Sequence, residues 1–231
     1  MRVQWNHFIG SNLRSGNVEY TGFEQGSPEW QKVRLGKVTG SRFDDLMHKG
    51  RGGAASKTTE SYMVELLSEI VTGLPADEIK AKPLEWGKKH EPSARACYSM
   101  DHSGRIKQVA FIDHPTQPRC GFSPDGLIGD DGILEIKCPF TSKVHLKTIL
   151  TNQVPDEYYW QVQGGLWVTG RQWCDFVSFD PRCPDGLNTW VVRAFRENSD
   201  IADLSERVQK FVDQLEIKLS RLRRYQNERG R

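Results

Sequence analysis

The stretch from residue 123 to residue 139 places two carboxylates and a lysine within reach of one another. Its centre, Gly129-Asp-Asp-Gly132, separates two short apolar runs, and glycine and aspartate tolerate the backbone angles of a tight hairpin turn. Side chains alternate along a strand, so Glu135 and Lys137 face the same side of the second strand. If the first strand pairs back across the turn, Asp125 approaches Glu135. Two carboxylates bind a hard divalent cation and a nearby lysine can orient or help to deprotonate a water molecule, so the stretch predicts a metal-dependent catalytic site.

The same short motifs also arise by chance, because 27% of the residues are charged. Pro-Asp-Gly recurs at 184–186, where only an apolar run follows it. Glu-Ile-Lys recurs at 78–80 in a polar connection, and at 216–218 in a strong helical pattern, where residues i and i+2 do not face each other. Only 125–137 combines the aspartate, the turn and a strand-borne Glu-x-Lys.

Length and composition predict one folded domain over residues 1–231, with a flexible basic loop at 49–57 and a C-terminal helix at about 200–224. No apolar run reaches the length of a membrane span, and the polar N-terminus does not resemble a signal peptide. The five cysteines are odd in number and include no Cys-x-x-Cys pair, which argues against a disulfide framework or a structural zinc site and favours a reducing cytoplasm.

The charge distribution is a weak guide to function. The formal net charge is only +2, which does not by itself indicate nucleic acid binding. Basic residues cluster at 32–42 and 80–89, and the last eleven residues hold five arginines. Such clusters are usually solvated surface, and they indicate DNA binding only if they line a groove beside the metal site.

The order of elements predicts an α/β (α+β) fold with a mixed central sheet. Helix signals occur at 28–35, 39–50, 58–72, 84–94, 141–150, 155–170 and 200–224, and strand signals at 106–112, within the hairpin, and at 172–179 and 189–195. Pro92 either bends the helix around it or divides it. The apolar stripe of the last helix either covers the sheet or meets another subunit. The helix start at Thr39-Gly40-Ser41 can bind a phosphate, but capping by its own side chains is the simpler expectation.

An ordered set of motifs resembles one nuclease family. Glu91 is followed by Ser-Pro-Asp-Gly at 123–126, Leu-Glu-Ile-Lys-Cys-Pro at 134–139 and Tyr-x-x-Gln-Val-Gln at 158–163, and the likeness covers about residues 25–195. The set resembles the lambda-type (YqaJ) viral recombinase exonucleases, which belong to the restriction-endonuclease-like PD-(D/E)xK nucleases. The resemblance implies a restriction-endonuclease-like core with a mixed central β-sheet flanked by helices.

The resemblance also implies roles for the residues of the predicted site. Asp125, Glu135 and the backbone carbonyl of Ile136 match ligands of magnesium, and Glu91 completes the metal environment. Two Mg²⁺ ions per site are implied, with Mn²⁺ able to substitute. Lys137 matches the lysine that positions or activates the attacking water.

Further matches extend beyond the hairpin. Gln161 matches a glutamine that supports the lysine. Arg34, Ser41 and Ser123 match a pocket for a terminal 5′-phosphate. Leu84 matches an apolar wedge that helps to separate the DNA strands, and Arg51 matches a DNA-contacting residue of an arm. The chain departs from the family pattern at Gly40, where alanine is frequent, and at Gly164-Gly165, where nucleases of the wider group often carry a tyrosine.

The implied activity is Mg²⁺-dependent 5′→3′ digestion of linear double-stranded DNA, which leaves 3′ single-stranded tails for phage-type recombination by strand annealing. A toroidal homotrimer, a single-strand annealing protein as partner and a phage-encoded protein in the bacterial cytoplasm are implied in the same way. No periodicity of the chain indicates a trimer. Two alternatives stay open, namely a structure- or site-specific endonuclease of the same fold and a non-catalytic DNA-binding recombination protein.

Overall fold

Nine strands form two separate sheets in the computed structural model, which describes residues 18–48, 56–76, 82–102 and 106–229. The smaller sheet has the order β1-β4-β5-β2, with β1 at Val18–Tyr20, β2 at Val38–Thr39, β4 at Phe111–Asp113 and β5 at Cys120–Phe122. The larger sheet has the order β3-β6-β7-β8-β9, with β3 at Ile106–Lys107, β6 at Gly126–Ile128, β7 at Gly132–Lys137, β8 at Trp173–Phe179 and β9 at Thr189–Phe195.

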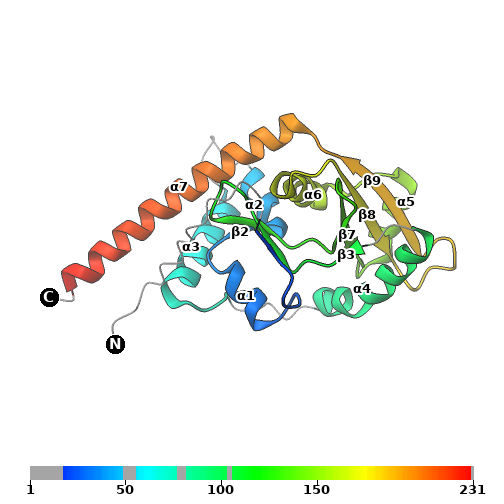
Figure 1. The fold of residues 1–231 in the computed structure, drawn as a ribbon, viewed down its shortest axis with the longest axis horizontal. Helices are drawn as coiled ribbons and strands as arrows, with labels where there is room; N and C mark the ends of the chain where they lie inside the picture. The colour runs from blue at the N-terminus through cyan, green and yellow to red at the C-terminus, as the bar shows by residue number, and fades with distance from the viewer. Residues whose placement is uncertain (1–17, 49–55, 77–81, 103–105, 230–231) are drawn as a thin grey trace.

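Helices surround the two sheets (Figure 1). Their bounds are α1 Pro28–Arg34, the 3₁₀ turn η1 Gly40–Arg42, α2 Phe43–Met47, α3 Lys57–Thr72, α4 Lys82–Asp101, α5 Ser142–Thr151, α6 Asp156–Thr169 and α7 Asn198–Arg229. Within the residues described, none of these helices is long and apolar enough to cross a bilayer. The predicted α/β class, with mixed sheets flanked by helices, is confirmed, although the strands form two sheets where one was expected.

The larger sheet is mixed and is covered by different helices on its two faces. β7 runs parallel to β8, whereas β6 and β9 pair with them in antiparallel fashion. On one face, Ile133 and Phe176 pack into a core shared with α6. On the other face, Leu134 and Val177 pack against Tyr98 of α4. The alternation of β7 therefore decides which of its side chains meets which helix.

The predicted hairpin is confirmed. Gly126 pairs with Leu134 and Ile128 pairs with Gly132 across the turn. Gly129 adopts a positive φ of 51°, a backbone conformation that glycine reaches without the steric penalty of a side chain. This register fixes the start of β6, and with it Asp125, opposite the middle of β7.

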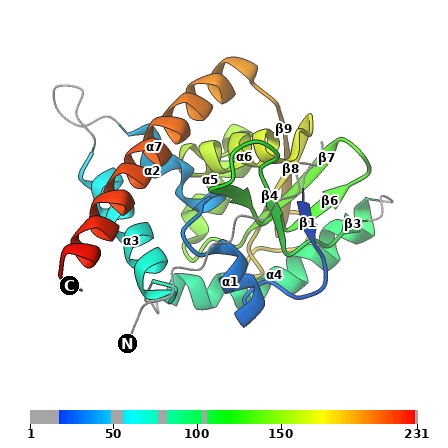
Figure 2. The same ribbon diagram turned by 60° about the vertical axis from the view of Figure 1, so that its left-hand side comes forward.

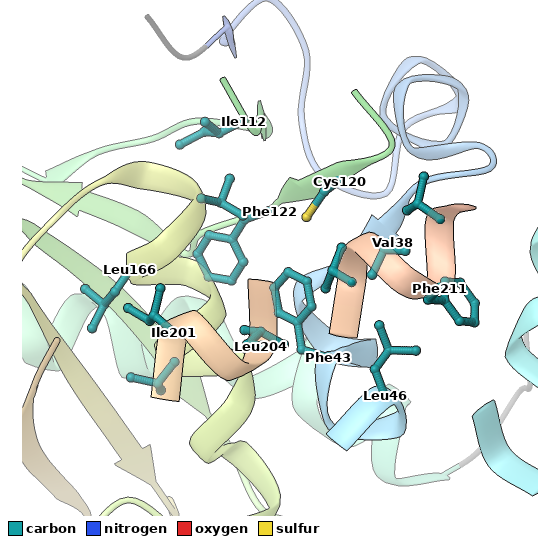
Figure 3. Packing of buried hydrophobic residues seen from close by; sticks show 14 of the residues in the cluster. Val38, Phe43, Leu46, Ile112, Cys120, Phe122, Leu166, Ile201, Leu204 and Phe211 are labelled. Carbon is teal, nitrogen blue, oxygen red and sulfur yellow. The ribbon is translucent and has the colours of Figure 1, made fainter. Parts of the chain in front are cut away.

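The apolar stripe of the long helix α7 packs within the chain, mainly against the helices α2, α3 and α6. Figures 1 and 2 show α7 along the side of the molecule that carries α2 and α3. Its buried residues Ile201 and Leu204 belong to the same core cluster as Phe43 of α2, and Figure 3 shows Leu204 beside Phe43. The stripe is buried through Leu219, whereas Leu222 is 38% exposed.

The structure corrects or refines three predicted elements. The single strand expected at 106–112 is two short strands, β3 and β4, which belong to different sheets because β3 pairs with β6 and β4 pairs with β1 and β5. Of the two alternatives for Pro92, division of the helix is wrong, because α4 is a single helix of 20 residues that contains this proline. The helix expected from Thr39 begins as η1, and no side chain caps it.

The close approach of α6 to α2 and β5 depends on the glycine pair Gly164-Gly165. Gly164 and Gly165 are both buried. A Cβ atom at Gly164 would overlap the ring of Phe43, and one at Gly165 would overlap the ring of Phe122. Glycine is required here by packing, because the helix could not approach these rings with a side chain in the way.

Candidate active site

Glu135 and Lys137 lie on the face of β7 that α6 covers. Their side chains project on the same side because they are two residues apart in a strand. The Nζ atom of Lys137 lies 2.7 Å from Oε1 of Glu135. The Glu135 residue is 1% exposed, so this ion pair is held where water screens it weakly.

Asp125 is locked against the same strand by two hydrogen bonds. Its backbone N–H donates to the carbonyl oxygen of Leu134 at 3.1 Å. Its Oδ2 atom accepts the backbone N–H of Ile136 at 2.6 Å. The carboxylate is therefore held beside Glu135 by backbone geometry, which is a stronger constraint than side-chain contacts alone.

The helix α6 contributes two further side chains to this site. Gln161 donates from Nε2 to Oε1 of Glu135, the oxygen that Lys137 also contacts. The ring of Tyr158, one helical turn earlier, lies 5.3 Å from Nζ of Lys137. The structure thus brings Asp125, Glu135, Lys137 and Gln161 together, and it adds Tyr158, for which the sequence analysis predicted no role.

The carboxylates of this site are held in an unfavourable electrostatic environment. Burial raises the pKa of Asp125 well above its usual range, and the charge of Glu135 raises it further. Burial also raises the pKa of Glu135, although Lys137 opposes this effect. Burial alone would lower the pKa of Lys137, but the two carboxylates raise it above its ordinary value, so the amine stays protonated. Two buried acids facing one lysine leave the site with a deficit of positive charge.

The donor set fits a hard divalent cation. The second carboxylate oxygen of Glu135, Oε2, is buried and has no hydrogen-bond partner among the described residues. An unpaired buried oxygen is costly, and a cation would satisfy it. Asp125 and Glu135 offer the oxygen ligands that Mg²⁺ prefers.

Glu91 does not complete a cluster in this structure. Across the described ranges, no three His, Cys, Asp or Glu side chains form a group that could hold a metal ion. Glu91 belongs to α4, and its Oε1 accepts a hydrogen bond from Arg95 Nη2 at 2.7 Å. The charge of Glu91 nevertheless raises the pKa of Asp125. The role of Glu91 as a third metal ligand stays a prediction.

Arg34 and Ser123 form a second cluster, at the end of α1. Arg34 Nη1 donates to the hydroxyl of Ser123 at 3.0 Å, and its Nη2 donates to the hydroxyl of Thr39 at 3.3 Å. The guanidinium also stacks on the ring of Trp30, with Cζ 4.1 Å from the centroid. Burial lowers the pKa of Arg34 below its ordinary value. Ser123 directly precedes the Pro124-Asp125 dipeptide, so this cluster adjoins the carboxylate site.

The other three predicted DNA-binding residues are placed less specifically. Ser41 lies on η1 and is exposed, and the hydroxyl from this segment that bonds Arg34 is that of Thr39. Leu84 is 56% exposed near the start of α4. Arg51 lies outside the described residues. The roles of Thr39 and Trp30 were missed because nothing in their spacing marks them as partners of an arginine.

The fold and the paired acidic residues define a restriction-endonuclease-like protein. A family model described as the YqaJ-like viral recombinase domain matches residues 29–172. The chain therefore belongs to the YqaJ-like viral recombinase family, which confirms the family predicted from the sequence motifs.

Solved structures agree with this assignment. The alkaline exonuclease LHK-Exo of Laribacter hongkongensis is 40% identical, with a TM-score of 0.80, over 87% of this chain and 99% of that chain. The same figures hold for LHK-Exo in complex with dAMP. A phage-related exonuclease from Haemophilus somnus 129PT shares the fold, with 20% identity and a TM-score of 0.58 over 79% of this chain and 96% of that one.

A curated relative is much longer than this chain. Protein R354 of Acanthamoeba polyphaga mimivirus is 27% identical over 190 residues, which cover 75% of this chain but only 32% of the viral protein.

Proposed function

We propose that this chain is a Mg²⁺-dependent exonuclease that digests one strand of linear double-stranded DNA from its 5′ end. The observation that carries the proposal is the cluster of Asp125, Glu135 and Lys137, in which a buried glutamate oxygen has no partner. LHK-Exo, which is 40% identical, is an alkaline exonuclease, and this supports the exonuclease part of the proposal.

The reaction requires charge compensation, because a phosphodiester is an anion that repels an incoming hydroxide. Asp125 and Glu135 would hold magnesium, which would supply charge neutralisation and a lower pKa of its bound water. Lys137, whose Nζ atom lies 2.7 Å from Oε1 of Glu135, would position or help to activate the attacking water. Gln161 holds the shared oxygen of Glu135, so the lysine and the carboxylate keep their relative position.

The Arg34 cluster supports an exonuclease that starts at a phosphorylated 5′ end. In the described part of the chain, the guanidinium donates to two hydroxyls and to no carboxylate, so its charge is left for an anion. An arginine fork matches the geometry of a terminal phosphate. Each cleavage creates a new 5′-phosphate, which the same pocket can hold in the next cycle, and this geometry favours processive 5′→3′ digestion.

Digestion from the 5′ end leaves 3′ single-stranded tails, the substrate for strand annealing. Membership of a viral recombinase family supports a role in recombination. We propose a single-strand annealing protein as the partner, a toroidal homotrimer as the assembly and a phage-encoded protein of the bacterial cytoplasm as the setting. Sedimentation of the protein alone and with duplex DNA tests the trimer.

The experiment that separates the candidate functions compares a linear duplex with a covalently closed circle, each with and without Mg²⁺. The proposed exonuclease degrades the linear duplex only when Mg²⁺ is present and leaves the circle intact. Cleavage of the circle would indicate an endonuclease of the same fold. Binding without cleavage of either substrate would indicate a non-catalytic DNA-binding protein.

A further inference from the structure

Arg95 joins two acidic residues that come from different elements. Its Nη2 atom donates to Oε1 of Glu91 at 2.7 Å, and its Nη1 atom donates to the backbone carbonyl oxygen of Asp125. Glu91 and Arg95 are four residues apart and lie on one face of α4. Asp125 directly precedes β6. One guanidinium thus connects the helix to the start of the hairpin.

The helix that carries Arg95 is itself fixed to the sheet. Tyr98, three residues later, is 2% exposed, and its hydroxyl donates to Oδ2 of Asp175 on β8 at 2.6 Å. Arg193 of β9 donates to both oxygens of Asp175, at 2.7 and 2.8 Å. The backbone of α4 is therefore anchored one turn from Arg95, and the position of the guanidinium is set by the fold.

We propose that Arg95 is a positioning residue, which holds one oxygen of Glu91 so that the other faces the metal site. This inference rests on the function proposed above. The rigid, planar guanidinium fork fixes its two acceptors relative to each other, so the carboxylate of Glu91 and the backbone of Asp125 keep one geometry.

The pair differs from an ordinary surface ion pair. The side chain of Arg95 is 21% exposed, compared with 70% for Lys210 in the helical pair that it forms with Glu206. Exposed helical pairs of that kind contribute little and leave both partners mobile. The second hydrogen bond of Arg95, to the Asp125 carbonyl, gives its pair a fixed orientation that a surface pair lacks. Hydrogen bonds that orient ligating carboxylates are a recurrent feature of metal sites.

The test is a direct measurement of Mn²⁺ binding, by electron paramagnetic resonance of the free ion, without DNA. Arg95→Met keeps an unbranched apolar stem and removes both hydrogen bonds, so the affinity for Mn²⁺ should fall by about 10- to 100-fold. Arg119→Met is the matched control. Arg119 also donates to a carboxylate, that of Glu216 on α7, and to a backbone carbonyl, that of Gly36, so its loss should leave Mn²⁺ binding unchanged.

A double-mutant cycle separates positioning from a general loss of structure. If Arg95 acts through Glu91, Arg95→Met should change the affinity little in a Glu91→Gln background. Arg95→Lys, which keeps the charge without the fork, should give an intermediate loss and replaces the methionine variant if that variant does not fold. Equal Mn²⁺ affinity in the parental protein and the Arg95 variants would overturn this inference alone, as would an equally large loss in the Glu91→Gln background. Absence of Mn²⁺ binding by the parental protein would overturn the proposed function as well.

Discussion

The Nζ atom of Lys137 lies 2.7 Å from the same oxygen of Glu135 to which Gln161 donates a hydrogen bond. One carboxylate oxygen is thus shared by two donors, while the other oxygen is buried and unpaired. A strand that presents Glu and Lys on one face and a helix that presents Gln opposite them are sufficient to build this arrangement. The consequence is that one oxygen of Glu135 is held in place by two donors, while the other has no partner within the described part of the chain.

Lys137→Met should slow DNA digestion strongly while the fold is retained. The substitution removes the charged donor that we propose acts on the water or the phosphate, and loss of one such donor lowers the rate constant by about 10²- to 10³-fold. The measurement is nucleotide release from linear duplex DNA in Mg²⁺. Lys210→Met removes a lysine that is ion-paired with Glu206 on the exposed face of α7, and it should leave the rate unchanged. Digestion by Lys137→Met at the parental rate would remove this residue from the mechanism.

Arg34→Met should weaken the preference for 5′-phosphorylated ends. The guanidinium donates to the hydroxyls of Ser123 and Thr39 and leaves its charge for a phosphate, so its loss should reduce the ratio of rates on phosphorylated and hydroxyl ends by about tenfold or more. Arg42 is the matched control. It also stacks on an aromatic ring, that of Tyr62, but it is ion-paired with Asp45 and Glu65. If Arg34→Met and Arg42→Met gave the same ratio as the parental protein, the pocket would be misassigned.

Gly164→Ala should destabilise the fold by about 1–3 kcal/mol, the usual cost of overpacking a core. The added methyl group would overlap the ring of Phe43, which is itself buried. The control is Gly87→Ala in α4, where a Cβ atom meets nothing within 4 Å. This change should stabilise the protein by about 0.5–1 kcal/mol, since alanine favours a helix over glycine. Urea unfolding of both variants measures the difference, and a destabilised Gly87→Ala together with an unaffected Gly164→Ala would contradict the packing described.

Because of His114, the free energy of unfolding should decrease as the pH falls from about 6.5 to about 4. Burial lowers the pKa of His114 from 6.5 to about 4 in the folded protein, where the ring centroid lies 4.2 Å from that of Trp167. Below pH 6.5 the unfolded chain takes up a proton that the folded chain does not, so this contribution to stability is complete above 6.5 and is lost on acidification.

The magnitude of the His114 effect is roughly 1–2 kcal/mol, because the ring is only partly buried and solvent screens part of the shift. In the parental protein, Nδ1 of His114 accepts hydrogen bonds from the backbone N–H groups of Thr116 and Gln117. His114→Asn places an amide oxygen near the same position, so it keeps an acceptor but removes the titrating group. The difference in unfolding free energy between the parental protein and this variant should therefore change with pH over that range. A constant difference would show that His114 does not titrate as described.

The part of the site that lies within one hairpin could be predicted from the sequence. The period of two along β7 and the Gly-Asp turn place Asp125, Glu135 and Lys137 together, because every contact involved is local. Gln161 and Arg34 came only from the family resemblance, since no pattern in the chain reveals that α6 covers this face of β7. Arg95 was missed, although its spacing of four residues from Glu91 is typical of a helical ion pair.

The division into two sheets could not be predicted for a related reason. The strand signal at 106–112 is correct locally, but β3 pairs with β6 while β4 pairs with β1 and β5. Pairing of Tyr20 with Phe111 joins residues about 90 positions apart, and strand propensity does not encode such a choice of partner. The fate of the α7 stripe was likewise undecided, because an apolar helix face has the same pattern whether it covers its own chain or another.

The most direct test of the central claim is digestion of one linear duplex labelled at its 5′ end and, in a second sample, at its 3′ end. We expect the 5′ label to be released early as mononucleotide, in Mg²⁺ only, while the 3′ label stays in long single strands. Asp125→Asn should release neither label, because it removes the negative charge with which we propose Asp125 binds Mg²⁺. Early release of the 3′ label, release of the 5′ label in the presence of a chelator, or parental release by Asp125→Asn would contradict the account.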